Sequence, residues 1–215
     1  MSYGFSIGEA LGFGWATFRD RFGTLIGLIV VSALVIGVVQ GVEQGLAQQK
    51  AGFLAFVVGI IGFVVQSVIS LGWTRITLKL HDGQGVEMSD LIEPYPLIWK
   101  YVGASILAGI AISIGFLILI VPGVFLAIRL GFFPYAIVDG GAGPVEALQK
   151  SWEITKGSFW HLFGLGIALA LVNMVGVIAL GIGLLVTVPT TAIAMAYVYR
   201  RLPERAPASE TAFAA

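Results

Sequence analysis

The sequence predicts an all-α polytopic membrane protein, with six transmembrane helices in three helical hairpins and amphipathic helices at the cytoplasmic interface. Three observations predict this fold: an apolar composition, six apolar runs of spanning length, and a segment that recurs later in the chain. Apolar residues form 58% of the 215 residues and charged residues 11%, and the mean hydropathy is +0.96. Because a soluble domain carries about 25% charged residues, this composition is typical of a chain embedded in a bilayer.

Six apolar segments are each long enough for one crossing, since a transmembrane helix needs about 20 residues. Pro122-Gly123 divides one long apolar stretch, and Gly181 and Gly183 with Pro189 divide another. These breaks predict two tight hairpins; the alternative is two long kinked helices and only four crossings. The six predicted spans are residues 23–39, 53–73, 101–121, 122–138, 159–180 and 184–199.

A repeated segment joins a short amphipathic stretch to a long apolar one. Glu9-Ala10-Leu11-x-x-x-Trp15 returns 137 residues later as Glu146-Ala147-Leu148-x-x-x-Trp152, and 12 of the 30 positions from 9 to 38 are identical at this offset. Chance predicts about two or three identities. The repeat therefore predicts a recurring unit of interfacial helix plus hairpin. Four spans separate the copies, so they run parallel, which argues against an inverted-repeat transporter.

We expect a single integral membrane domain over residues 1–201 and a flexible cytoplasmic tail over 202–215. This domain would consist of three repeat units, which cover about residues 6–80, 87–139 and 144–200. The middle unit is assigned from its pattern alone. Each unit would begin with an interfacial segment: residues 6–22, 88–100 and 144–156. The middle segment contains Pro94 and Pro96, so we expect a short helix followed by an irregular turn,.

Basic residues orient the chain. Ten of the 12 Lys and Arg residues lie on one predicted side, Lys50 lies on the other, and Arg129 lies within a span. By the positive-inside rule both termini are predicted to be cytoplasmic. The tryptophans gather at the same boundary, where they act as anchors or meet anionic lipid head groups together with nearby cations. These candidate interfacial anchors are Trp15, Arg19, Trp73, Trp99, Trp152, Lys156 and Trp160.

Arg129 is the strongest candidate for a polar site inside the membrane. It lies seven residues past Pro122, about 10 Å along a helix,, and a cation at that depth needs a partner or water. Asn173 and Gln66 are the predicted partners. The cation would bind an anionic ligand such as a lipid head group, or it would serve a structural role by bonding carbonyls and amides between helices.

Other chemistry is not indicated by the residue pattern. The chain has no cysteine, and His81 and His161 are isolated, so we predict no metal site and no cofactor,. We expect the four acidic residues of the second cytoplasmic loop to be solvated: Asp82, Glu87, Asp90 and Glu93,. The sequence contains no Walker loop, and no residues are placed to suggest a catalytic triad. No basic run suggests nucleic acid. The spacing Gly37-x-x-x-Gly41-x-x-x-Gly45 indicates either a close helix contact or a flexible turn,.

Part of the chain resembles a large bacterial group of membrane domains. The residues that carry the resemblance include Gly143-Pro144-x-Glu146-Ala147-Leu148-x-x-Ser151-Trp152-x-x-Thr155-Lys156-Gly157 and Pro122-Gly123-Val124-Phe125-Leu126-Ala127-Ile128-Arg129. They resemble the membrane domain attached to some glycerophosphodiester phosphodiesterases and related stand-alone membrane proteins of unassigned function. The resemblance covers most of residues 6–201 and implies a six-span domain, without the soluble phosphodiesterase activity.

These observations favour a non-enzymatic inner-membrane protein that acts through lateral contact with lipid, with another membrane protein, or with itself. One-sided interfacial helices suited to gripping the cytoplasmic leaflet support this interpretation. The alternative is a small transporter or lipid-handling protein with a polar site around Arg129, and a membrane enzyme comes third. A water-filled cavity reaching Arg129 would favour the alternative, whereas a dry interior would favour lateral contact.

Overall fold

The computed structural model describes residues 5–48, 52–179 and 181–202, and all regular structure in these ranges is helical. Five helical segments are long and apolar enough to cross a membrane: Phe22–Leu46, Gly52–His81, Met88–Ile118, Ile120–Gly140 and Phe159–Ile178. The all-α class and a multi-pass membrane architecture agree with the sequence. Most of the predicted tail, Lys50 on the opposite side, and Leu180 at the end of the fifth predicted span lie outside the described residues.

The helices follow one another with short connections. Their bounds are α1 (Ile7–Asp20), α2 (Phe22–Gln48), α3 (Gly52–His81), α4 (Ile98–Ile118), α5 (Ile120–Leu130), α6 (Phe133–Gly140), α7 (Pro144–Ile154), α8 (Phe159–Ile178) and α9 (Leu184–Arg201). Between α3 and α4 the chain forms two 3₁₀ turns, η1 (Met88–Leu91) and η2 (Tyr95–Leu97). The turns occupy the segment where the prolines predicted a short helix and an irregular turn.

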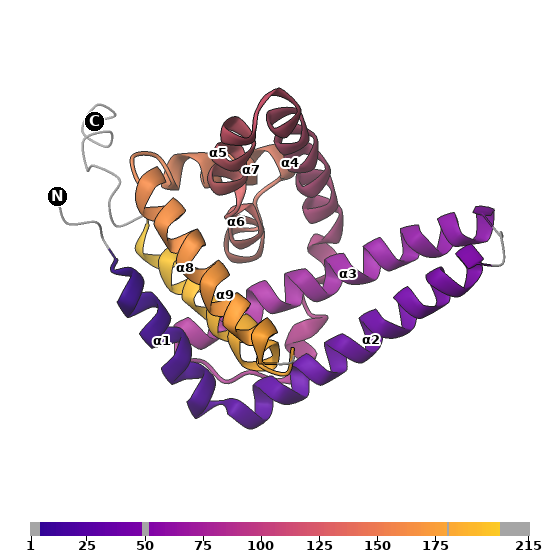
Figure 1. Ribbon diagram of the computed structural model, residues 1–215, viewed down its shortest axis with the longest axis horizontal. Coiled ribbons are helices and arrows are strands. Elements are labelled where there is room, and N and C mark those ends of the chain that lie inside the picture. The colour runs from indigo at the N-terminus through magenta and orange to yellow at the C-terminus, as the bar shows by residue number, and fades with distance from the viewer. Residues whose placement is uncertain (1–4, 49–51, 180, 203–215) are drawn as a thin grey trace.

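Three helical hairpins diverge from a common base (Figure 1). The base consists of the C-terminal ends of α3, α6 and α9 together with α1, and its buried core includes Ala10, Leu78, Tyr135, Ala194 and Val198. The hairpin of α2 and α3 reaches furthest from this base. Because the hairpins diverge, only 11–33% of the residues in their most apolar windows are buried. Most of the apolar helix surface therefore faces outward.

The two shorter hairpins close in the same way, through contacts between glycines. A Cβ on Gly115 of α4 would lie 2.9 Å from the Cα of Gly123 in α5, and a Cβ on Gly183 would lie 2.7 Å from the Cα of Gly176 in α8. Hydrogen in place of a side chain lets the paired backbones approach this closely. Both hairpins predicted from sequence are thus present.

The first of these hairpins turns at a different residue from the one predicted. Leu119, with extended backbone angles (φ −164°, ψ 159°), separates α4 from α5. Pro122 lies in the first turn of α5, where a residue without an N–H is tolerated because the helix has no acceptor for that N–H. The predicted division at Pro122-Gly123 is therefore wrong by about one helical turn.

The sixth predicted crossing, residues 184–199, is not confirmed. The corresponding helix α9 is not among the segments apolar enough to span. It packs against α1, α3 and α8, and it buries Pro189, Thr190 and Thr191. The threonine hydroxyls donate to carbonyls of their own helix, for example Thr190 to Val186 at 2.7 Å. α9 is thus a core helix of the base.

Helices α1 and α7 form in two of the three segments that were predicted to be interfacial. The buried residues are Ala10, Gly14 and Phe18 in α1 and, at the same 137-residue offset, Ala147 and Ser151 in α7 and Thr155 directly after it. Trp15 and Trp152 remain 50% and 38% exposed. Small residues allow close helix approach, which leaves the large ones to face outward.

Each short segment packs against helices that precede or follow it in a hairpin unit other than its own. η1 packs on α3, α7 packs on α4, α5 and α6, and α1 packs on α9. In two of these contacts a glycine meets backbone directly: a Cβ on Gly14 would overlap the carbonyl oxygen of Thr190, and one on Gly72 of α3 would overlap that of Leu91. Helix α1 is thereby joined to helix α9.

Candidate functional site

Arg129 lies at the contact between α5 and α7. Its guanidinium donates from Nη1 to the carbonyl oxygen of Trp152 at 3.1 Å and to the Thr155 hydroxyl at 3.4 Å. The same group lies over the rings of Phe125 and Trp152, at 5.3 and 4.8 Å from their centroids. A cation is favoured at the C-terminal end of a helix, where carbonyls lack partners. Arg129 therefore holds the end of α7 against α5.

The Ser151 hydroxyl completes this attachment at the break between α5 and α6. It donates to the carbonyl oxygen of Arg129 at 2.7 Å and accepts from the N–H of Phe132 at 3.0 Å. Thr155 donates to the Ser151 carbonyl at 2.8 Å. Ser151 and Thr155 belong to the segment that carries the family resemblance, which assigned them no role. Their role here is to satisfy backbone groups where one helix ends and the next begins.

The Arg129→Leu variant is expected to lose about 1.5–3 kcal/mol of unfolding free energy, because hydrogen bonds from a charged donor to the end of α7 disappear. Thermal unfolding in detergent measures this loss. The exposed Lys156, one residue past Thr155, offers a matched control: Lys156→Leu also removes a charge and should leave stability nearly unchanged. An Arg129→Leu variant as stable as the parent that loses a bound ligand would establish a ligand role instead.

The structure does not bring the three predicted polar residues together. Asn173 in α8 donates to the hydroxyl of Thr191 in α9 at 3.3 Å. Gln66 in α3 lines a groove between α2 and α3. Arg129 has its partners in α7. The three residues were predicted as partners because they are the polar residues of apolar spans, but depth in a span does not determine which helix lies next to it.

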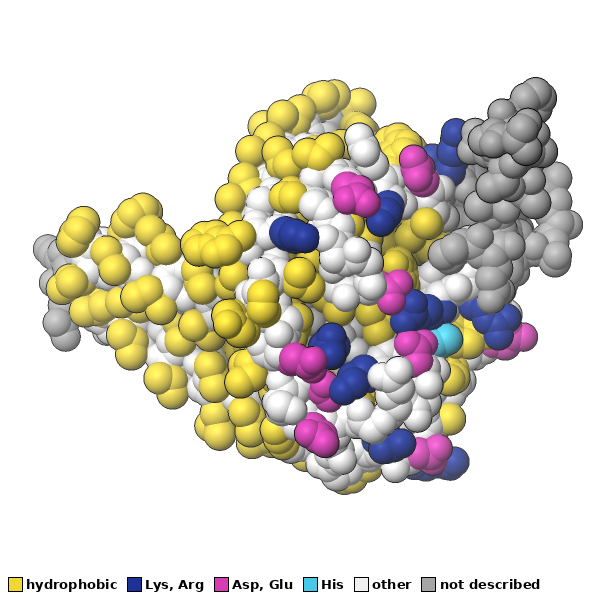
Figure 2. Space-filling model, turned by 180° about the vertical axis from the view of Figure 1, so that it is seen from behind, with side chains coloured by type: hydrophobic (Ala, Val, Ile, Leu, Met, Phe, Trp, Pro, Cys, Tyr) yellow, Lys and Arg dark blue, Asp and Glu magenta, His cyan; other side chains and the backbone are white. Residues whose placement is uncertain are grey.

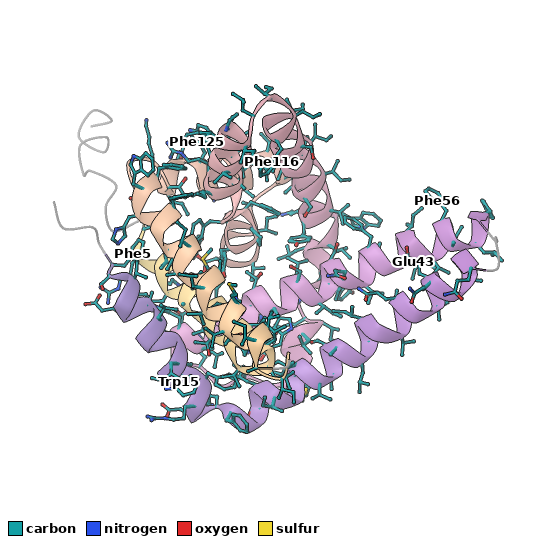
Figure 3. All side chains as sticks on the ribbon, viewed as in Figure 1. Phe5, Trp15, Glu43, Phe56, Phe116 and Phe125 are labelled. Carbon is teal, nitrogen blue, oxygen red and sulfur yellow. The ribbon has the colours of Figure 1, made fainter. Side chains whose placement is uncertain are left out.

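The groove that contains Gln66 also contains Gln40 and Glu43 of α2, which sequence reasoning missed. It has a volume of about 170 Å³ and is otherwise lined mainly by aliphatic side chains and by Gly59 and Gly62 of α3. Figure 3 labels Glu43 on the α2 arm of the long hairpin. The available signal was the spacing of Gln40 and Glu43, because residues at i and i+3 share a face of a helix,.

The glycines at positions 37, 41 and 45 were predicted to form either a close helix contact or a flexible turn, and they do not form the close contact. A Cβ on any of them would meet nothing within 4 Å. α2 also continues as a helix to Gln48, which excludes the flexible turn. The close approach within this hairpin is made instead by Gly62, where a Cβ would lie 2.8 Å from Val39.

A set of ion pairs joins the three helix ends of the base. Arg200 of α9 donates to Asp82 from Nη2 at 2.6 Å and from Nε at 3.2 Å, and from Nη1 to Asp139 of α6 at 2.8 Å. Asp82 directly follows α3, so one guanidinium connects α3, α6 and α9. We call Asp82, Asp139, Tyr199 and Arg200 the base cluster. A guanidinium fork matches carboxylates in this bidentate manner.

Electrostatics in the base cluster favour the ionised carboxylate and the neutral phenol. Burial alone would raise the pKa of Asp82, but Arg200 and His81 hold it below its ordinary value of 3.8. Burial and the neighbouring Asp139 raise the pKa of Tyr199 to about 12, so its phenol stays protonated and donates to Asp139 at 3.4 Å. Both effects follow from desolvation and nearby charge.

The second loop is not fully solvated, contrary to expectation. Asp90 is buried, and it accepts from Lys79 at 2.5 Å and from the N–H of Glu87 at 2.8 Å. Arg75 lies nearby and pairs with Glu93 at 2.5 Å. A buried carboxylate is held by partners in this way because an unpaired one is costly. These pairs attach η1 to α3.

Glu9 and Glu146 occupy equivalent places at the starts of α1 and α7. Glu9 accepts from the N–H of Ser6 at 3.3 Å, and Glu146 accepts from the N–H of Gly143 at 3.2 Å. Lys150 and that Gly143 N–H hold the pKa of Glu146 below its ordinary value. The carboxylates thus cap helix N-termini, as is usual for acidic residues there.

The predicted anchors are mostly exposed on the structure. The indole rings of Trp99 and Trp160 are the most exposed of the five tryptophans, and Arg19 and Lys156 are also exposed. Trp73 is partly buried and donates to the Ser32 hydroxyl of α2 at 3.1 Å. Figure 2 shows acidic and basic side chains interspersed on one face of the base, while the long hairpin presents hydrophobic side chains. Anchoring at a membrane interface remains a prediction for these residues.

The described chain has spanning helices, outward apolar surfaces and a base closed by ion pairs, and these define a multi-pass helical membrane protein. The chain belongs to the family described as "Domain of unknown function (DUF7847)", whose model matches residues 83–214. The comparisons show no link to the membrane domain of the phosphodiesterases. The unassigned function of the family agrees with the other part of the resemblance, to stand-alone membrane proteins of unassigned function. Among the described residues no group of His, Cys, Asp and Glu side chains could hold a metal ion.

Curated relatives occur in mycobacteria. The uncharacterized protein Rv2560 of Mycobacterium tuberculosis is 22% identical over 228 residues, covering 94% of this chain and 70% of the relative. The uncharacterized protein Mb2590 of Mycobacterium bovis is 22% identical over 232 residues with the same coverage. No solved structure matches the chain.

Proposed function

We propose that this protein is a non-enzymatic component of the bacterial cytoplasmic membrane that acts through lateral contacts of its hairpins with selected lipids or with a membrane protein. Both termini lie in the cytoplasm in this proposal, by the positive-inside rule. The base, with its ion pairs and short helices, lies at the cytoplasmic interface, and α1 and α7 place Trp15 and Trp152 toward the head groups.

The divergence of the hairpins is the observation that supports this proposal. Val38 of α2 is 66% exposed, Leu117 at the end of α4 is 85% exposed, and Ile178 at the end of α8 is 71% exposed. A closed transporter bundle would bury such residues against one another, at interaxial distances of about 8–10 Å. Exposed apolar patches of this extent mark surfaces that meet other molecules.

Site-specific photo-cross-linking tests the proposal in intact membranes. Benzoylphenylalanine at Val38 is expected to give an adduct of discrete mass, either with one polypeptide or with a lipid class enriched over the bulk membrane. Mass spectrometry of the adduct distinguishes lipid from protein. The same group at the exposed loop residue Gln84 is the control and should give no such adduct. Adducts that match bulk lipid composition, or links only within the chain, would contradict the proposal.

An apolar groove supports lipid handling as a second candidate function. The groove has a volume of about 270 Å³ and lies between α5 and α8, and Met195 of α9 and Phe116 of α4 also line it; Figure 3 labels Phe116. Ala127 and Ile128 line it, one turn or less from Arg129. Its apolar lining fits an acyl chain. In this candidate function a lipid is bound and exchanged, and Ala127→Trp would abolish lipid retention on purification.

A further inference from the structure

Glu43 is the one charged side chain in helix α2 (Phe22–Gln48). It lies 21 residues after Phe22, about 32 Å along α2 at 1.5 Å per residue. The hydrocarbon core is about 30 Å thick. Glu43 therefore lies near the far boundary of the membrane, at the level of the head groups of the leaflet opposite the base.

The carboxylate of Glu43 lies in the groove against α3. A Cβ on Gly59 would lie 3.2 Å from its Oε1, so the glycine leaves room for the carboxylate. Gln40 lies one turn away on the same face of α2 and lines the same groove,. Gln66 lines it too, from α3. Since Glu43 is level with Gly59, Gln66 lies about 10 Å deeper along α3.

No cation within the described residues neutralises Glu43. The ion pairs of the described chain involve Asp82, Asp90, Glu93, Asp139 and Glu146 as acids. A carboxylate close to hydrocarbon is unfavourable without a partner, and ionisable residues in such places generally have one. A cationic ligand in the groove would supply it.

A primary ammonium group fits the acceptors that the groove offers. An ammonium group carries three N–H donors and no acceptor, and the Glu43 carboxylate and the Gln40 carbonyl oxygen are both acceptors. Charge-assisted hydrogen bonds of this kind are about twice as strong as neutral ones. Deeper in the groove, the N–H groups of Gln66 fit an ester carbonyl, the group that follows the head group in a phospholipid. Apolar residues such as Val39 and Phe63 complete the lining.

We propose that the groove between α2 and α3 binds a primary ammonium group, as carried by the head group of an aminophospholipid, with Glu43 as its counter-ion. The lipid's head group lies at Glu43 and its glycerol esters lie toward Gln66, which matches the orientation of a lipid in the leaflet opposite the base. This inference rests on the proposed lateral contact and names a ligand for it.

Lipid binding to the full chain, measured by native mass spectrometry, tests the site. Phosphatidylethanolamine and phosphatidylglycerol with identical acyl chains are titrated in parallel. The parent is expected to bind phosphatidylethanolamine about tenfold more tightly, and Glu43→Gln should abolish this preference. Glu43→Lys should reverse it, since an ammonium side chain attracts the anionic head group. Gln44→Leu, on α2 but outside the groove, is the matched control and should keep the parent's preference.

Two further measurements complete the test. Thermal unfolding checks that Glu43→Gln remains folded, which is expected because its carboxylate has no ion-pair partner in the described chain. Competition with free ethanolamine separates the two sources of the ligand: displacement of the lipid assigns recognition to the ammonium group alone, and no displacement assigns it to the whole lipid. Equal binding of both lipids by the parent, or an unchanged preference in Glu43→Gln, would overturn the site. Neither result affects the Val38 adducts, which test lateral contact regardless of head group.

Discussion

Gly14→Ala is expected to destabilise the protein by about 1–3 kcal/mol or more, the usual cost of forcing an extra group into a packed contact. The new Cβ would overlap the carbonyl oxygen of Thr190, which is backbone and cannot rotate away. α1 and α9 would have to separate, and the base core around Ala10 and Ala194 would open with them. Chemical or thermal unfolding in detergent measures the effect.

The neighbouring Gly12 provides the control for this experiment. A Cβ there would meet nothing within 4 Å, and the residue lies in the same helix. Because alanine favours helix over glycine by about 0.8–1.0 kcal/mol, Gly12→Ala should be neutral or stabilising. Equal stability of the two variants would show that α1 does not pack on α9 as described.

Arg200→Met is expected to weaken the base by about 1–3 kcal/mol, since hydrogen bonds to two carboxylates are lost and the partners are about one-third exposed,. In the variant, the free energy of unfolding should also depend less on pH. The folded-state pKa of Asp82 is lowered, so its contribution to stability is complete at neutral pH and is lost as the pH falls below the ordinary carboxyl value and through the folded pKa. The parent should therefore lose stability in this acid range more steeply than the variant.

Thermal unfolding at neutral and acid pH checks both parts of this expectation. Arg201→Met is the matched control: Arg201 lies over the Tyr197 ring at 5.2 Å and forms no ion pair within the described residues. It should keep the parent's pH profile. If Arg200→Met and Arg201→Met behave alike, the ion pairs of Arg200 do not hold the helix ends together.

Much of the fold could be predicted because helix length and hydrophobicity are local properties. The apolar runs predicted the helices that are long enough to span, and the interfacial segment predicted to begin at residue 144 forms a helix that begins there, α7. Leu25 and Leu162, which the repeat aligns, are both almost fully buried. The turn at Leu119 could not be predicted, since it depends on the Gly115–Gly123 contact between two helices.

The candidate sites were less predictable than the fold. Arg129 has hydrogen-bond partners, but they are Trp152 in α7 and Thr155 directly after it, and not the predicted Asn173 and Gln66. Periodicity marks which residues share a face, and it does not tell which helix meets that face. For the same reason the sequence pattern did not identify Ala147 and Ser151 as the residues that α7 buries against its neighbours.

The contact between α1 and α9 has a consequence for biosynthesis. Gly14 and Thr190 are 176 residues apart in sequence, which at about 5–20 residues per second corresponds to roughly 9–35 s of synthesis. Helix α1 therefore leaves the ribosome well before its partner α9 has been made. During that interval the surface stripe of Ala10, Gly14 and Phe18 has no protein partner in α9. A capped helix with Trp15 on its flank can wait on the bilayer surface, so assembly of the base is completed only when translation of α9 ends.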